Sequence, residues 1–271
     1  MLNKKGMQFI WIFSLVAGVI IIFLFTSFAM KYKDLQERKT DFEIVNNLNN
    51  AFQKLGNEEI SVSLNFVKET SIRCGVIQIK GSPDSHKTDK IIFAGDRLKD
   101  NTIVWQSNFN YPFKIANFYY VVDKDAKFNL QDESLLEKIP DSLKSNFNSL
   151  TGRKIFFNKN LYTKGKDNYY VDVNNKIVEN LDAKYKYYND EMLLGILIGE
   201  NQKCLLDEID NKIKEISSLY FEKVASLKDC EYSNALKILN EMKELKNLDE
   251  NFDLLEKENR MLIGMNCVGI Y

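Results

Sequence analysis

The first feature of the hydrophobic pattern is an apolar run near the N-terminus. In residues 7–30, polar side chains occur only at Gln8, Ser14, Thr26 and Ser27. About two dozen residues at 1.5 Å per residue form a helix of roughly 36 Å, which is long enough to cross a hydrocarbon core of about 30 Å. The run therefore predicts a transmembrane helix.

The length and the far end of this run favour an anchor over a cleaved signal. A secretory signal has an apolar core of about 7–15 residues and ends at a small-residue cleavage site. This run is longer, and its end at residues 28–31 lacks such a site. We expect a retained anchor and no second span, because the next most apolar stretch, Met192–Ile198, is too short to cross a membrane.

Beyond the apolar run, the pattern predicts an amphipathic stalk helix. Apolar residues recur at spacings of three, four or seven, which places them on one face of a helix. These residues are Leu35, Phe42, Val45, Leu48, Phe52 and Leu55. Gly56 is a suitable C-cap. Anchor and stalk together are expected to form one rod of roughly 70 Å, whose apolar face packs on the following domain or on a neighbouring subunit.

From Ile60 the hydrophobic period changes to two, which is typical of half-buried strands. The loop at residues 81–86 is polar and contains Gly and Pro. The expected strands are Ile60–Phe66, Ser71–Lys80, Ile91–Ala94, Thr102–Ser107 and Phe113–Val122. Together they predict an antiparallel sheet of about five strands.

The remaining chain predicts a small α/β piece followed by helices. Ser134–Leu150 is expected to be helical with an interruption at Pro140, and two short strands follow. The strands are Lys154–Phe157 and Tyr169–Val173, and the later helices are Glu200–Lys223, Tyr232–Lys246 and Leu248–Ile263. Gly195 lies inside an apolar run and indicates a close approach or a turn.

The predicted fold class is therefore α+β. It comprises an N-terminal transmembrane helix continuing into an amphipathic stalk helix, an antiparallel β-sheet, a small α/β piece and a C-terminal bundle of about three helices. The expected segments are 1–30 (membrane anchor), 31–56 (stalk helix), 57–130 (β-sheet region), 131–188 (small α/β region) and 189–271 (C-terminal helical region).

Composition and charge exclude some functions. The 271 residues have a formal net charge of -1, and no segment is strongly basic, so we expect no nucleic-acid partner. Hydrophobic residues make up 45% and charged residues 28%, which is typical of a globular protein. The chain has no phosphate-binding glycine loop, dinucleotide-binding turn or zinc-protease helix, so we expect no cofactor and no catalytic residue.

The four cysteines are spaced for disulfides rather than for metal binding. None forms a C-x-x-C pair, and a single histidine, His86, argues against a Cys/His zinc site. If the last three helices pack up-and-down, Cys230 and Cys267 lie at the same end, which leaves Cys74 to pair with Cys204. The alternative is four buried free thiols.

The side of the membrane on which the body lies is indicated by two opposed signals. Lys4 and Lys5 precede the apolar run, whereas Lys31, Lys33, Arg38 and Lys39 follow it, so the positive-inside rule favours a cytoplasmic body. Large domains translocate largely regardless of flanking charge, and disulfides form in oxidising compartments. We expect the body to lie outside the cytoplasm.

Three local features of the sequence are candidate sites. His86 lies in a polar loop and is expected to be a solvated surface residue. The acidic cluster from Asp123 to Glu133 departs from a calcium loop, since Lys127 occupies the fifth position and Ser134 the twelfth, so a solvated turn is expected and no metal.

The third feature is an aromatic stretch that forms a candidate binding surface. Trp105 and Phe113 lie on the strands expected on either side of a turn at Pro112, and Tyr111 lies beside that proline. Aromatic residues favour strands, so core packing explains the pattern. A platform for a sugar or peptide is the alternative.

The extreme N-terminus resembles the class III signal of type IV prepilins. The resemblance rests on Lys4-Lys5-Gly6 before the apolar helix. In that family a membrane peptidase cleaves after the glycine, which implies cleavage between Gly6 and Met7 and assembly of the helix into a filament. The family has Glu at the fifth mature position, where this chain has Trp11.

The body resembles an uncharacterised family of single-pass membrane-anchored proteins from small-genome (DPANN-type) archaea. The residues that carry the likeness are the Lys-Lys-Gly anchor, Arg73-Cys74-Gly75, Pro112-Phe113 with Asn117-Phe118, and residues 259–262 and 267–271. The resemblance implies a cell-surface protein with paired cysteines and supplies no activity.

The sequence thus predicts a membrane-anchored, extracytoplasmic structural or interaction protein, in the manner of a pilin-like surface subunit, and not an enzyme. Its expected partners are membrane lipid and, through the N-terminal helix, copies of itself or another surface protein. The alternatives are a ligand-binding or sensor module that uses the aromatic sheet, and a hydrolase of unrecognised type.

Overall fold

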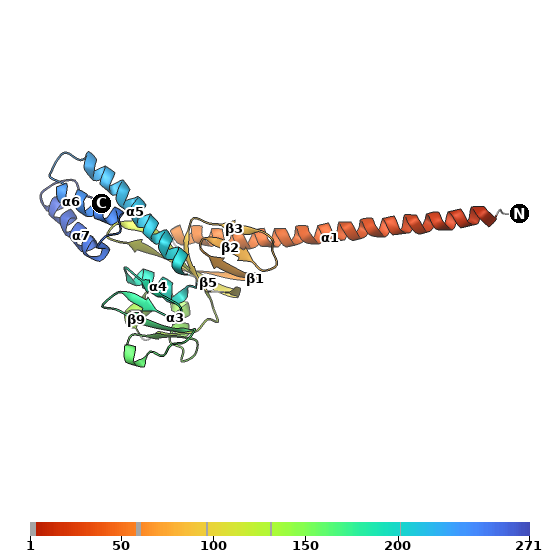
Figure 1. The fold of residues 1–271 in the computed structure, drawn as a ribbon, viewed down its shortest axis with the longest axis horizontal. Coiled ribbons are helices and arrows are strands. Elements are labelled where there is room, and N and C mark those ends of the chain that lie inside the picture. The colour runs from red at the N-terminus through yellow and green to blue at the C-terminus, as the bar shows by residue number, and fades with distance from the viewer. Residues whose placement is uncertain (1–3, 58–60, 96, 131, 201) are drawn as a thin grey trace. The chain divides into compact units, whose positions relative to one another are not determined.

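The computed structural model describes residues 4–57, 61–95, 97–130, 132–200 and 202–271, and it has an α+β fold (Figure 1). The chain divides into two compact units, one ending at Asn46 and the other comprising Asn47–Tyr271. The second unit contains two mixed sheets and the C-terminal helices, which confirms the predicted α+β class. The first sheet, however, is not purely antiparallel.

Helix α1 runs from Lys4 to Asn57 without a break. It is long and apolar enough to cross a membrane, and none of its most apolar window is buried. The predicted apolar face of the stalk is divided: Leu35 and Phe42 are exposed, whereas Leu48, Phe52 and Leu55 are buried. The Phe52 ring lies 4.5 Å from that of Tyr119, so the last turns of α1 belong to the core of the second unit.

The first sheet has six strands in the order β3-β2-β1-β5-β6-β4. The strands are β1 Ser61–Arg73, β2 Val76–Ile79, β3 Ser85–Lys87, β4 Ile91–Ala94, β5 Leu98–Asn110 and β6 Lys114–Asp123. All pairs are antiparallel except β4 with β6, which is parallel. The sequence cannot show this direction, because β4 is buried at all four positions and has no alternation.

A two-residue hairpin turn divides the predicted strand Ser71–Lys80. Arg73 pairs with Val76, so Cys74 and Gly75 form the turn between β1 and β2. Their φ angles are +52° and +68°, and two positive angles are typical of the type I′ turn that suits strand twist. Cys74 is therefore held at a turn rather than within a strand.

The second sheet has five strands in the order β11-β10-β9-β8-β7. They are β7 Phe128–Asn129, β8 Arg153–Phe156, β9 Asn168–Asp172, β10 Ile177–Glu179 and β11 Lys184–Lys186. Strands β7, β8 and β9 are parallel to one another. The predicted helix over 134–150 is two helices, α2 Glu133–Glu137 and α3 Asp141–Phe147, with Pro140 between them as predicted.

Four helices complete the second unit: α4 Asp190–Ile198, α5 Gln202–Ser226, α6 Ser233–Lys243 and α7 Leu248–Gly264. The last three agree with the predicted helices. The short helix α4 is buried from Met192 to Ile198. A Cβ atom on Gly195 would lie 2.5 Å from the Phe93 ring, so this glycine permits a close approach between α4 and β4.

Candidate functional site

The predicted aromatic binding surface is part of the core. Trp105 and Phe113 are only 2% and 3% exposed. The Trp105 ring stacks on Tyr120 at 4.9 Å, and the Phe113 ring stacks on Tyr220 at 4.3 Å. Their flat faces are covered by protein and are not open to a ligand. The alternative prediction, a sugar or peptide platform built on these two rings, is therefore wrong. Core packing explains the aromatic pattern.

Tyr111 has a different role, because it joins a polar network centred on Asp249. Its hydroxyl donates a hydrogen bond to Asp249 Oδ1 at 2.7 Å. Lys176 Nζ donates to the same oxygen at 2.8 Å, and Lys186 Nζ lies 2.9 Å from Oδ2. The four residues come from the β5–β6 turn, the β9–β10 turn, β11 and the first turn of α7. The network therefore ties both sheets to the C-terminal helices.

The electrostatics of this network favour ionised Asp249. Burial alone would raise its pKa, but hydrogen bonds from Lys176, Tyr111 and Lys186 lower the pKa to about 2. Burial and the hydrogen bond to Asp249 raise the pKa of Tyr111 far above that of a free phenol. A permanent anion and a permanently protonated phenol are suited to a structural cross-link and not to proton transfer near neutral pH.

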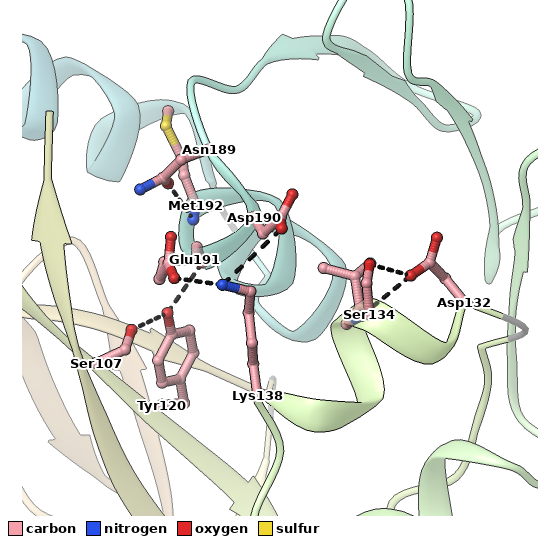
Figure 2. Close-up of polar contacts among 10 residues, drawn as sticks. Ser107, Tyr120, Asp132, Ser134, Lys138, Asn189, Asp190, Glu191 and Met192 are labelled. Atoms are coloured by element: carbon pink, nitrogen blue, oxygen red, sulfur yellow. Dashed lines mark hydrogen bonds and ion pairs between the residues drawn. The ribbon is translucent and has the colours of Figure 1, made fainter. Parts of the chain in front are cut away.

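A second polar cluster holds the N-terminus of α4 (Figure 2). The Asn189 side chain caps the helix by accepting from Met192 N at 3.0 Å. Lys138 Nζ lies 2.6 Å from Glu191 Oε1 and 3.9 Å from Asp190 Oδ2, so a lysine that follows α2 forms ion pairs with two carboxylates and offsets part of their charge. Their negative charge is favourable at a helix N-terminus.

Tyr120 supports the same end of α4 from the first sheet. Its hydroxyl donates to the backbone oxygen of Glu191 at 2.9 Å and lies 2.7 Å from Ser107 Oγ, as Figure 2 shows. Because the tyrosine proton is used in the bond to Glu191, the serine hydroxyl donates to the tyrosine oxygen. Burial raises the pKa of Tyr120, although the bond with Ser107 opposes the shift. The neutral phenol, with both of its hydrogen bonds made, therefore connects the first sheet to the N-terminus of α4.

Arg153 of β8 holds the opposite end of α4. Its Nη1 donates to the backbone oxygens of Leu197 and Ile198, the latter at 2.9 Å, and Nη2 lies 3.2 Å from Glu200 Oε1. The guanidinium also lies 4.9 Å from the Tyr169 ring centre. The last carbonyl groups of a helix lack partners within the helix, so a buried arginine is a suitable cap. Helix α4 is thus fixed at both ends between the two sheets.

Two disulfides cross-link the second unit. Cys74 in the β1–β2 turn pairs with Cys204 in the first turn of α5, with Cα atoms 5.6 Å apart. Cys230, between α5 and α6, pairs with Cys267, which follows α7, at a Cα separation of 5.9 Å. These are the two predicted pairs. The first connects sheet to helix, and the second fixes the segment that follows α7.

A cavity of about 490 Å³ lies where the three parallel strands of the second sheet end. Asn129 ends β7, Phe156 ends β8, and Val173 follows β9. Asp132, Asn158 and Leu161 also line it. The carboxyl ends of parallel strands are the usual place for ligands in open sheets, and the volume suits a small organic molecule. Sequence reasoning missed this cavity because β7 has only two residues.

The remaining candidates lie apart from these clusters. His86 is on the edge strand β3, paired in register with Ile77, and is half-buried rather than in a solvated loop. Asp123 ends β6, and its carboxylate accepts from the backbone of Asp125 at 2.8 Å, as in a polar turn. The predicted processing bond Gly6–Met7 lies within α1 and stays a prediction.

Sequence reasoning also missed the networks around Asp249 and α4. Their members are separated by up to 138 residues, as with Tyr111 and Asp249. The N-terminus of α4 did have a sequence signal. Asn189-Asp190-Glu191 before an apolar run is typical of a helix N-cap followed by acidic residues in the first turn. No comparable signal identifies Arg153 or Lys176, because their partners are backbone or distant groups.

Comparisons of the chain with protein-family models, with curated proteins and with solved structures find no match.

Proposed function

We propose that this chain is a membrane-anchored, extracytoplasmic structural or interaction subunit without catalytic activity. The observation that carries the proposal is α1. Its large apolar residues between Trp11 and Met30 are exposed, as in a segment that is solvated by lipid, whereas Phe52 near its end is a core residue of the folded unit. One helix thus supplies both an anchor and part of the folded body.

The two disulfides support a body outside the cytoplasm. All four cysteines are paired, and disulfides persist in oxidising compartments. The polar clusters support a binding or structural role over catalysis. In both, the charged and phenolic groups bond to one another or to helix ends, and such groups hold elements together.

More specifically, we propose that the chain is a pilin-like surface subunit. It is supported by a class III signal-like Lys4-Lys5-Gly6 and by a long N-terminal helix whose last turns pack on a sheet through Phe52 and Tyr119. Trp11 replaces the usual glutamate of that signal family, so a different contact must align neighbouring helices. The resemblance to archaeal surface proteins is consistent with this proposal.

The oligomeric state tests the proposal. We expect the full chain to form oligomers in detergent or membranes, and the Asn47–Tyr271 unit alone to be monomeric, as measured by light scattering with mass analysis. Circular dichroism of the shorter chain is the control for folding. A full chain that stays monomeric in membranes contradicts the proposal of a self-assembling subunit.

Ligand binding is a second candidate function, favoured by the cavity at the ends of β7, β8 and β9. A lining of apolar side chains, two asparagines, Asp132 and Lys154 fits a small polar molecule with an apolar face. Ligand-detected NMR with a fragment library tests it. Binding that is lost in Leu161→Asp but kept in Leu181→Asp, an exposed leucine elsewhere, supports this function, and no binding by the wild-type chain rejects it.

A further inference from the structure

The part of α1 that follows the apolar run carries large apolar side chains that are more than half exposed. Tyr32, Leu35 and Phe42 are 56%, 64% and 66% exposed. Their spacing, with Lys39 between the last two, is three, four and three residues, so all four lie on one face of the helix. Apolar side chains in a coiled-coil seam have this spacing.

The same spacing extends back through the membrane segment. Phe28, Phe25, Ile21, Gly18 and Ser14 precede Tyr32 at alternating steps of four and three. Ile21, Phe25 and Phe28 are each more than half exposed, and a Cβ atom on Gly18 would meet no other atom. Small residues four apart, as at positions 14 and 18, allow helices to approach closely in a membrane. We call the face from Ser14 to Phe42 the α1 seam.

We propose that a second copy of this chain covers the α1 seam, forming a parallel, in-register two-helix coiled coil. The inference rests on the proposed function and names its partner. Both copies are anchored by the same segment, so they share direction and depth, and equal residues face each other. A seam that continues without interruption from the membrane into the stalk fits a partner of the same length and register.

Charge also favours this partner. With Tyr32 and Lys39 at the a positions and Leu35 and Phe42 at the d positions, Arg38 occupies a g position and Glu43 the following e position. In a parallel in-register pair, a g residue faces the next e residue of the partner, so Arg38 of each copy meets Glu43 of the other. A lysine at one a position penalises other registers.

The ion pair Lys33–Glu37 lies on the outer face of the stalk. Its atoms are 3.7 Å apart within one helix, and the two residues occupy b and f positions. Both side chains are exposed, at 77% and 47%, as the seam residues are, so the two faces differ in heptad position and not in exposure. These two residues provide matched control positions at the same depth as the seam.

Cysteine cross-linking of the full chain in native membranes tests the register. Leu35→Cys and Phe42→Cys are each expected to give a same-site disulfide dimer under mild oxidation, because equal d positions of two copies face each other. Lys33→Cys and Glu37→Cys are expected to give none. All four positions are exposed, so the substitutions leave the folded unit intact.

Charge exchange tests the pairing independently. Each chain also carries Leu35→Cys and one of two tags. Arg38→Glu chains and Glu43→Arg chains are each expected to lose the same-site dimer, because like charges then face each other. Mixing the two restores both attractive pairs, so the mixed dimer should exceed its statistical share. A mixed dimer at the statistical share overturns the pairing.

The outcomes distinguish this inference from the proposed function. Cross-links between Leu35→Cys and Phe42→Cys of different copies, or stronger links at the outer positions, overturn the in-register seam while showing that the anchored chains assemble. Absence of every cross-link, together with a monomeric chain in membranes by amine cross-linking, overturns both.

Discussion

At the scale of single residues, Gly195 shows how one missing side chain sets the packing of the interior. It is the residue of α4 that faces the Phe93 ring, and the glycine allows helix and strand to touch. The apolar run around it predicted either a close approach or a turn, and the structure shows a close approach inside a helix.

Gly195→Ala is therefore expected to destabilise the protein. The added methyl group would overlap the Phe93 ring, and overpacking of a core costs about 1–3 kcal/mol. Gly264→Ala, at the end of α7 with open space around it, is the matched control and should be neutral or slightly stabilising. Urea unfolding followed by the fluorescence of buried Trp105, in a Trp11→Phe background, measures both.

Asp249 predicts a pH dependence of stability. Its folded pKa of about 2 lies below the ordinary value of 3.8, so its contribution is present above about pH 4 and is lost as pH falls through 2. Because the side chain is 37% exposed, the contribution is about 1 kcal/mol after allowance for screening.

Asp249→Asn should remove this contribution. The variant is expected to be less stable than wild type at pH 7 and to lose less stability between pH 4 and pH 2. Asp84→Asn, at an exposed loop position, is the control. Parallel stability curves for wild type and Asp249→Asn over this range would show that the carboxylate is not held by Lys176 and Lys186.

At the scale of elements, α4 depends on groups that the rest of the chain supplies. Arg153 bonds the carbonyl groups of Leu197 and Ile198 and is only 10% exposed. Replacing it with an apolar residue would leave buried acceptors without a donor, and hydrogen bonds to charged groups contribute about 1.5–3 kcal/mol.

Arg153→Met is accordingly expected to lower the free energy of unfolding by about 2–3 kcal/mol. Arg153→Lys should cause a smaller decrease in the free energy of unfolding, because a single ammonium group cannot make all the hydrogen bonds of the planar guanidinium. The neighbouring Lys154→Met, at an exposed position, should change little. Equal effects of the substitutions at 153 and 154 would contradict the cap.

The disulfides make a graded prediction. The chain-entropy relation gives about 5 kcal/mol for the pair separated by 130 residues and about 4 kcal/mol for the pair separated by 37. Replacing Cys74 and Cys204 with Ala should therefore lower stability more than replacing Cys230 and Cys267. Thermal unfolding of both double variants in non-reducing buffer measures the order, and the reverse order would contradict it.

Elements with a strong period were predictable from sequence, and elements defined by partners were not. The three late helices have clear 3.6-residue patterns, and the cysteine pairs followed from their up-and-down packing. No hydrophobic period indicates the direction of β4, or the presence of the short strands β7, β10 and β11. These features depend on pairing with neighbouring strands. The contacts of Asp249 and Arg153 could not be predicted either, because their partners are distant in the sequence.

At the scale of the whole molecule, an exposed apolar helix segment and the paired cysteines of the body are the features that point to a membrane-anchored protein. The stalk shows what sequence periodicity can and cannot establish. It identified an apolar face over Leu35–Leu55, but it could not show that Leu48 and Phe52 pack in the folded unit while Leu35 and Phe42 stay exposed. A periodic face predicts a contact without naming its partner.

Labelling of the four cysteines on intact cells tests whether the anchored body is disulfide-bonded and lies outside the cytoplasm. We expect a membrane-impermeant maleimide to leave the full chain unlabelled on intact cells, and to label its cysteines there after treatment with an impermeant reductant. Labelling without reductant, or labelling that requires permeabilised cells, would contradict an anchored, disulfide-bonded body outside the cytoplasm.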